Sequence, residues 1–153
     1  MLQDITVLHV EDDAAFRDLT AEFLEGVDDT ITVESESDPT VVPARVRTEP
    51  VDCVVSDLDM PEQDGLELCQ LVRTEHPTLP FILFTNRSGE EVIERALATG
   101  ATDYLQKETG THHYTLLANR IRLVVSRHRA IQRLGSVDAK ALEVAGDPEP
   151  GLE

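Results

Sequence analysis

Short runs of apolar residues alternate along this chain with longer segments in which apolar residues recur every three or four positions. A short apolar run bounded by polar residues predicts a buried strand, and the longer period predicts an amphipathic helix. The five predicted strands cover residues 5–10, 30–35, 51–56, 81–84 and 102–105. The five predicted helices cover about 16–24, 38–49, 66–76, 90–99 and 112–133, and Gly135 is predicted to end the last one.

Strands and helices alternate throughout this prediction, and the connections between them are short. Such alternation is typical of an α/β fold in which an open, doubly wound parallel sheet carries helices on both faces. We therefore expect residues 1–134 to form one domain with an extended last helix. The residues that follow, 135–153, are mostly polar or small, and we interpret them as a tail or linker.

The net charge of the chain argues against partners that are themselves negatively charged. Its 30 acidic and 13 basic residues give a formal net charge of −17, which opposes binding to nucleic acid or to an anionic membrane. No apolar segment is long enough to span a membrane and the first residues lack the pattern of a secretory signal, so we expect a cytoplasmic protein. The acidic composition with only two lysines favours a halophilic protein over an ordinary acidic one.

Polar side chains that can carry chemistry follow four of the predicted strands. They are Glu11, Asp12 and Asp13 after the first strand, Asp57 and Asp59 after the third, Thr85 and Asn86 after the fourth, and Lys107 after the fifth. Functional groups gather at the carboxyl ends of parallel strands, and the first and third strands are expected neighbours, so Asp12 should lie close to Asp57. Crowded carboxylates raise one another's pKa unless a cation intervenes, and hard oxygen ligands of this kind suit Mg²⁺.

A metal ion, a lysine, a hydroxyl and a carboxylate nucleophile are the groups that phosphoryl transfer to a side chain requires. Each residue also has a simpler interpretation. Asp13 is predicted to cap the first helix, and Asp57 or Lys107 taken alone is more simply a solvated surface charge. The arrival of all of them at one edge of the sheet favours the functional interpretation.

Five segments carry a resemblance to a known family. They are Val7–Asp13, Val54–Pro61, Gln63–Leu68, Phe84–Thr85 and Asp103–Lys107. In this order and spacing they resemble the receiver domains of two-component response regulators, over about residues 5–133. The resemblance implies a flavodoxin-like sheet with strand order 2-1-3-4-5 and five flanking helices. It also implies a signalling switch, not an enzyme with an external substrate, that takes a phosphoryl group from the phosphohistidine of a sensor histidine kinase.

The resemblance also assigns roles to the residues at the strand ends. It implies that Asp57 is the phosphoacceptor, that Lys107 and Thr85 contact phosphoryl oxygens, and that Tyr104 is an aromatic switch which moves inward as Thr85 shifts. The groups it implies around Mg²⁺ are Asp12, Asp57, the backbone carbonyl of Asp59 and, through water, Glu11.

Three residues depart from the pattern of the family. Glu108 follows the lysine where the family usually has proline, so the loop after the fifth strand is expected to be looser. Asn86 is larger than the small residue often found after the threonine, and Asp59 adds a carboxylate two residues past the acceptor. We hypothesise that Asp59 and Asn86 together tune the lifetime of the phosphoryl group, because both would border it.

The last predicted helix carries arginines and no acidic residue between positions 109 and 137; they are Arg120, Arg122, Arg127, Arg129 and Arg133. Two interpretations compete. Either these cations favour the helix terminus and cover apolar surface, or they form an output face that docks another helix or an acidic partner or begins a signalling coiled coil. The expected partner of such a face is a downstream protein, a fused sensor or kinase domain, or a second copy in a homodimer. The segments 81–85, 104–107 and 116–121 are similar to receivers at the front of haloarchaeal sensor kinases, in which the long last helix leads into sensor and kinase modules.

Two other functions remain as alternatives. The sequence Asp57-Leu58-Asp59 after an apolar strand also occurs in aspartate-nucleophile phosphohydrolases of the haloacid dehalogenase type. Met60-Pro61 does not suit that loop, and no paired acidic motif follows downstream. A degenerate receiver that binds partners without taking phosphate is the second alternative, against which the complete set of site residues argues.

Overall fold

The computed structural model describes residues 4–145 of the chain, and side chains over residues 4–135. One parallel sheet forms the centre, with strand order β2-β1-β3-β4-β5. Its strands are β1 (Ile5–Val10), β2 (Ile31–Glu36), β3 (Cys53–Ser56), β4 (Phe81–Thr85) and β5 (Asp103–Gln106). The helices are α1 (Ala14–Val27), α2 (Val42–Thr48), α3 (Gly65–Glu75), α4 (Glu90–Ala98) and α5 (His112–Ala145), with a 3₁₀ turn at Pro39–Val41 before α2. The predicted fold class and strand order are confirmed.

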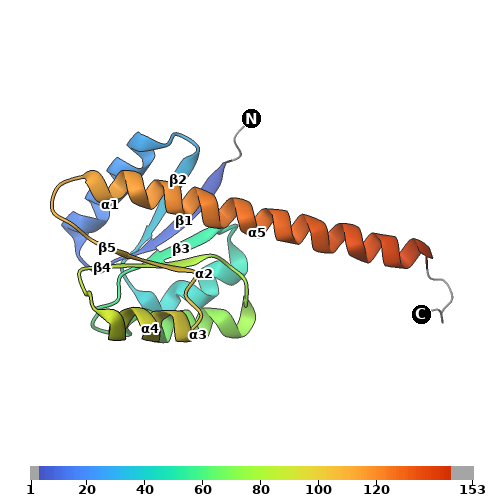
Figure 1. The fold of residues 1–153 in the computed structure, drawn as a ribbon. Coiled ribbons are helices and arrows are strands. Elements are labelled where there is room, and N and C mark those ends of the chain that lie inside the picture. Colours follow the sequence, from blue (N-terminus) through green and yellow to red (C-terminus); the bar gives the residue numbers. More distant parts are fainter. Residues whose placement is uncertain (1–3, 146–153) are drawn as a thin grey trace.

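Helices cover both faces of the sheet (Figure 1). α1 and α5 lie on one face, where Val7 of β1 and Tyr114 of α5 belong to the same apolar core. The other helices lie on the opposite face, where Leu8 of β1 packs in a second core with residues of α2 and α3. Because neighbouring residues of a strand point to opposite faces and both faces are covered, β3 and β4 are buried at every position.

Acidic residues cap the first turns of two helices. The side chain of Asp13 accepts a hydrogen bond from the amide of Phe16, which confirms that Asp13 caps α1. Asp64 and Glu67 form a reciprocal capping box at the start of α3. These caps satisfy amide groups that have no partner within their own helix, and they fix where α1 and α3 leave the loops that follow β1 and β3.

The prediction that Gly135 ends the last helix is wrong, because α5 continues to Ala145. A glycine inside a helix costs only about 1 kcal/mol relative to alanine, and Gly135 does not have the positive φ of a helix-ending glycine. In Figure 1 the carboxyl-terminal half of α5 projects beyond the rest of the fold. The division into a domain (1–134) and a tail (135–153) stays a prediction, of which residues 146–153 lie outside the described part.

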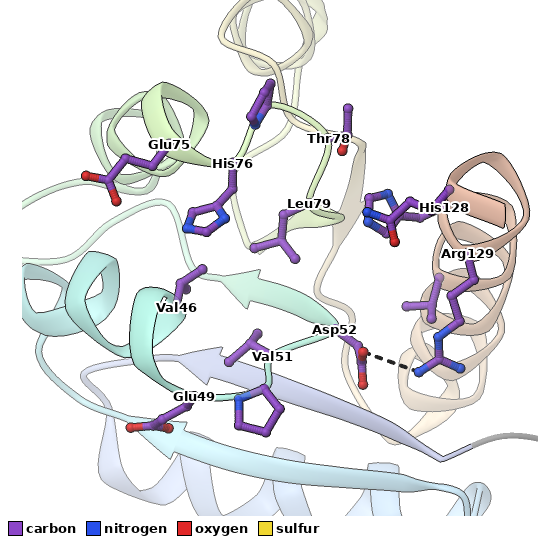
Figure 2. A pocket seen from close by; sticks show the side chains of 14 residues that line it. Val46, Glu49, Val51, Asp52, Glu75, His76, Thr78, Leu79, His128 and Arg129 are labelled. Carbon is purple, nitrogen blue, oxygen red and sulfur yellow. Dashed lines mark ion pairs between the residues drawn. The ribbon is translucent and has the colours of Figure 1, made fainter. Parts of the chain in front are cut away.

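Three arginines of α5 bind the body of the domain. Arg120 pairs with Asp103 at 2.7 Å, and Arg122 pairs with Asp28. Arg129 pairs with Asp52 at 3.2 Å, an ion pair that Figure 2 shows beside a hollow of about 470 Å³ at the amino-terminal end of β3. Neither interpretation predicted these ion pairs, which give three of the five arginines a structural role within the domain.

A different face of α5 points away from the domain. Leu123, Ile131 and Leu134 are each more than 60% exposed. Over the residues that the structure describes, no helix is both long and apolar enough to cross a membrane. These three side chains thus leave apolar surface uncovered within the described fold, although Ile131 also borders a hollow with Thr78 and Pro80.

Candidate functional site

The carboxyl ends of β1 and β3 lie side by side and bring two acidic loops together. Val10 of β1 pairs with Ser56 of β3, so the next residues, Glu11 and Asp57, leave the sheet at the same level. The amide of Asp57 donates a hydrogen bond to the carbonyl of Val10 at 3.1 Å. The adjacency that the sequence predicted is thus produced by strand register.

Three carboxylates converge at this edge. Glu11, Asp12 and Asp57 each offer an oxygen, and these oxygens all lie within 4.8 Å of one another. Glu11 and Asp57 are buried, at 2% and 8% exposure, whereas Asp12 is exposed. They line a hollow of about 400 Å³ that is also bordered by Asn86 and Glu108. This geometry can hold a hard cation while leaving room for a further ligand.

Lys107 extends from the end of β5 into the same group. Its Nζ atom lies 2.9 Å from an oxygen of Glu11 and 3.4 Å from an oxygen of Asp57. The side chain is 8% exposed, and the ammonium also lies 4.2 Å from the centre of the Phe16 ring. A buried cation between two carboxylates is positioned to neutralise negative charge that arrives there.

The electrostatics of the two buried carboxylates reflect opposing effects. Burial raises the pKa of Asp57, and Lys107 together with the amide of Leu58 opposes that rise. Burial likewise raises the pKa of Glu11, again against the hydrogen bond from Lys107. Both carboxylates are thus costly to keep charged without further positive charge, which is the condition that favours binding a cation.

The main chain around Asp57 is closely packed. Its Oδ1 atom accepts a hydrogen bond from the amide of Leu58 at 2.8 Å, and the carbonyl of Leu58 accepts one from Gly65 at the start of α3, also at 2.8 Å. A Cβ atom at Gly65 would lie closer than 3.0 Å to the Asp57 carbonyl oxygen and 2.8 Å from Leu83. Only glycine fits at this approach of α3 to the acceptor strand.

Thr85 and Tyr104 are linked through the main chain of Arg87. The hydroxyl of Thr85, which is fully buried, accepts a hydrogen bond from the amide of Arg87 at 3.2 Å. The hydroxyl of Tyr104 donates one to the carbonyl of the same residue. The two residues predicted to switch together therefore share a hydrogen-bonded neighbour.

Arg87 is a site residue that the sequence analysis missed. Its guanidinium binds the carboxylate of Asp59 through two hydrogen bonds of 3.2 Å, joining the loop after β4 to the loop after β3. Both side chains are more than half exposed. The available signal was a cation two residues after Thr85 in a chain with few cations. Asp59 was predicted to bind metal through its backbone carbonyl, and that role stays a prediction.

Comparisons with known proteins place the chain in a family. The family model for the response regulator receiver domain matches residues 7–118. The chain is 39% identical to the response regulator protein FleR of Pseudomonas aeruginosa over 102 residues, which is 66% of this chain and 21% of FleR. It is 31% identical to the probable transcriptional regulatory protein TcrX of Mycobacterium tuberculosis, over 95% of this chain and 58% of TcrX.

Other relatives contain more than this chain spans. A protein-glutamate methylesterase/protein-glutamine glutaminase of Methylobacillus flagellatus is 29% identical over 84% of this chain, which is 38% of the length of that protein. The chain thus spans well under half of several of the curated relatives that it matches.

Solved structures share the fold. The chemotaxis response regulator CheY4 of Vibrio cholerae superimposes with a TM-score of 0.70 at 25% identity, covering 78% of this chain and 99% of CheY4. A CheY-like receiver domain protein of Methanospirillum hungatei superimposes with a TM-score of 0.72 at 23% identity, covering 84% of this chain and 98% of that protein. From the matched family model, the similar regulators and the fold, we conclude that this chain belongs to the response regulator receiver domains of two-component signal transduction.

Proposed function

We propose that this receiver takes a phosphoryl group on Asp57 from the phosphohistidine of a sensor histidine kinase. The observation that carries the proposal is the convergence of Glu11, Asp12, Asp57 and Lys107 at one edge of the sheet. The carboxylate of Asp57 lines an open hollow, so a donor can approach it. No other group of three or more acidic, histidine or cysteine side chains among the described residues has comparable metal-binding spacing.

The proposed transfer is a displacement at phosphorus. A carboxylate oxygen of Asp57 forms the new O–P bond while the P–N bond of the donor phosphohistidine breaks and its electron pair returns to the imidazole nitrogen. Lys107 holds a phosphoryl oxygen by its charge, and the hydroxyl of Thr85 donates to another. Water later attacks phosphorus, which releases inorganic phosphate and restores the carboxylate. The chain acts on its own phosphoryl group and on no external substrate.

The residues present fit Mg²⁺. Three carboxylate oxygens within 4.8 Å of one another form a donor set for a hard cation, and burial raises the pKa of two of these carboxyl groups, Glu11 and Asp57. Asp12, Asp57 and the backbone carbonyl of Asp59 would hold the ion directly, and Glu11 would act through water. When bound, the ion neutralises charge on the phosphoryl oxygens.

Phosphorylation would be read out through Thr85 and Tyr104. A shift of the Thr85 hydroxyl toward the phosphoryl group alters its hydrogen bond with the Arg87 amide, and the carbonyl of Arg87 carries the contact with Tyr104. This connection gives Tyr104 a path by which it can change position when Asp57 is modified.

Beryllofluoride tests the proposal, because it mimics a phosphoryl group on a carboxylate. With Mg²⁺ present, NMR signals of Thr85 and Tyr104 should shift, and they should stay unchanged without Mg²⁺. The Asp57→Asn variant should not respond under either condition. An intact protein that shows no response with Mg²⁺ would be evidence against the phosphoacceptor role and would favour a degenerate receiver.

We also propose a cytoplasmic location, and an output partner that binds the outward face of α5, without involvement of nucleic acid or a membrane. The partner is a downstream protein, a fused sensor or kinase domain of the kind found with haloarchaeal receivers, or a second copy of the chain. The apolar side chains of Leu123, Ile131 and Leu134 support it. A molar mass by light scattering that equals a single chain both with and without beryllofluoride would argue against the homodimer.

A further inference from the structure

Glu108 follows Lys107 at the position where this family usually has proline. Unlike proline, Glu108 has an amide hydrogen that can form a hydrogen bond. The amide of Glu108 donates a hydrogen bond to Nδ1 of His113, in the first turn of α5, at 2.7 Å. The preceding amide, that of Lys107, donates to the carbonyl of Thr85 at 2.8 Å. The amides of Lys107 and Glu108 thus donate to β4 and to α5, respectively. The loop after β5, which the sequence predicted to be looser, is therefore held by hydrogen bonds to both elements.

His113 is itself held firmly. Its side chain is 3% exposed and its ring packs against Phe84 at 5.2 Å and Phe16 at 6.3 Å between ring centres. Phe16 is also the ring that lies under the ammonium of Lys107. The imidazole therefore contacts the same apolar wall as the lysine side chain, while its Nδ1 atom binds the main chain next to that lysine.

We infer that His113 positions Lys107: its neutral imidazole accepts the amide hydrogen of Glu108 and so holds the lysine main chain where the ammonium reaches Asp57 and Glu11. The inference rests on the role proposed for Lys107 and Asp57. His113 acts through the loop, and touches neither the acceptor nor the phosphoryl group.

The bond requires the neutral form of His113. Burial lowers the pKa of His113, Lys107 lowers it further, and Glu108 opposes them. The elements packed on the ring from α1 and β4 contribute Phe16 and Phe84, which are uncharged, and Tyr114 is its titratable neighbour on α5. With Nδ1 as the acceptor, the neutral ring carries its hydrogen on Nε2, which has no hydrogen-bond partner among the described residues. A second proton would have to bind Nδ1, where it faces the amide hydrogen of Glu108 and finds no acceptor. The bond is present at neutral pH and is lost as the pH falls through the lowered pKa of the ring.

The first measurement uses the unchanged protein. A scalar coupling between the Glu108 amide nitrogen and His113 Nδ1, observed by NMR at neutral pH, is the expected result, and it should vanish on acidification. Protonation of Nδ1 instead of Nε2 at neutral pH would overturn the inference, because a protonated Nδ1 cannot accept the hydrogen bond.

The second measurement is the affinity for beryllofluoride in the presence of Mg²⁺. His113→Phe keeps a ring but removes the acceptor, and it should weaken binding about two- to tenfold, the value of one hydrogen bond. His113→Asn, which places an oxygen acceptor near the position of Nδ1, should recover part of the loss. His112→Phe, which makes the same exchange at the exposed neighbouring position, is the matched control and should bind as the unchanged protein does.

A double-variant comparison separates positioning from packing. In a Glu108→Pro background no amide hydrogen is available, so adding His113→Phe should weaken binding no further. The unchanged protein should also lose affinity at acidic pH more steeply than His113→Phe does. If His113→Phe binds beryllofluoride as tightly as the unchanged protein at every pH, the inference about His113 is wrong and the proposed function stands. If neither His113→Phe nor the unchanged protein binds beryllofluoride, the proposed function itself is wrong.

Discussion

At the scale of single residues, Gly65 shows how the acceptor is held by its surroundings. The start of α3 approaches the main chain of Asp57 so closely that a Cβ atom would overlap it. The hydrogen bond from Gly65 to Leu58, at 2.8 Å, depends on that approach. The position of the Asp57 side chain thus depends in part on Gly65, because a residue with a side chain would not fit there.

We predict that Gly65→Ala destabilises the fold by about 1–3 kcal/mol, the usual cost of forcing extra atoms into a packed site. It should also weaken beryllofluoride binding, because Asp57 must move. Gly26→Ala is the matched control: nothing lies within 4 Å of its added Cβ, and alanine favours the helix α1, so stability should stay the same or rise slightly. Urea denaturation measures both, and equal stabilities of the two variants would contradict the prediction.

We propose that Asp59 and Asn86 together set how long Asp57 keeps its phosphoryl group. The ion pair between Asp59 and Arg87 is therefore expected to affect the rate of dephosphorylation. Because the pair joins the two loops beside Asp57, we predict that Arg87→Ala opens the site to water and speeds dephosphorylation, by at most about fivefold for so exposed a pair. Arg47→Ala, which breaks a similarly exposed pair with Glu75 elsewhere, should leave the rate unchanged. Release of phosphate from the phosphorylated protein is the measurement.

That measurement also tests the joint role of the two tuning residues. Exchanging both Asp59 and Asn86 for alanine should change the dephosphorylation rate. An unchanged rate in the double variant would remove the basis for the lifetime hypothesis, whatever the result for Arg87.

At the scale of elements, α5 is attached to the domain by specific arginines. Arg122 and Thr30 donate hydrogen bonds to Asp28, which follows α1, so the pair ties the last helix to the first helix and to β2. Burial alone would raise the pKa of Asp28, but these hydrogen bonds outweigh burial and lower the pKa below its ordinary value. The ion pair is therefore a stabilising contact whose strength depends on pH.

We predict that Asp28→Asn costs about 1.5–3 kcal/mol of stability at neutral pH, the value of a hydrogen bond to a charged group. A carboxylate with a lowered pKa contributes stability above its ordinary pKa, and that contribution is lost as the pH falls through the folded-state value. The difference between variant and unchanged protein should thus shrink in acid. Asp29→Asn, at the exposed neighbouring position, is the control and should have little effect on stability. Urea denaturation at several pH values measures the free energy of unfolding of each protein. A stability difference between Asp28→Asn and the unchanged protein that does not vary with pH would contradict the role of the ion pair.

At the scale of the whole molecule, the dominant property is a net charge of −17 on a chain of 153 residues. Like charges on one compact surface repel one another and oppose folding, while the described contacts place most arginines beside carboxylates. We propose that the protein is adapted to high salt, where the repulsion is screened over a distance of about 3 Å at 1 M.

We predict that the melting temperature rises by several degrees between low and molar KCl. Sucrose strengthens apolar burial without screening charge, so a parallel series in sucrose separates the two effects. A melting temperature that falls with KCl would show that the remaining ion pairs matter more than the repulsion, and would count against salt adaptation.

The sequence by itself was sufficient for the order of strands and helices, because apolar periodicity follows directly from which faces are buried. It was also sufficient to identify Glu11, Asp12, Asp57, Thr85 and Lys107 as site candidates, since parallel strands expose their carboxyl ends at one edge. The end of α5 was not predictable from Gly135, because a glycine ends a helix only where the main chain adopts a positive φ.

Contacts between loops were decided only by the tertiary structure. Arg87 meets Asp59 across 28 positions of sequence, and Arg122 meets Asp28 across 94. The hydrogen bond from Glu108 to His113 joins residues only five positions apart, yet it forms only because α5 begins at a particular place relative to β5. Such pairings depend on the direction in which each loop leaves the sheet, and a one-dimensional pattern of apolar and polar residues carries no information about that direction.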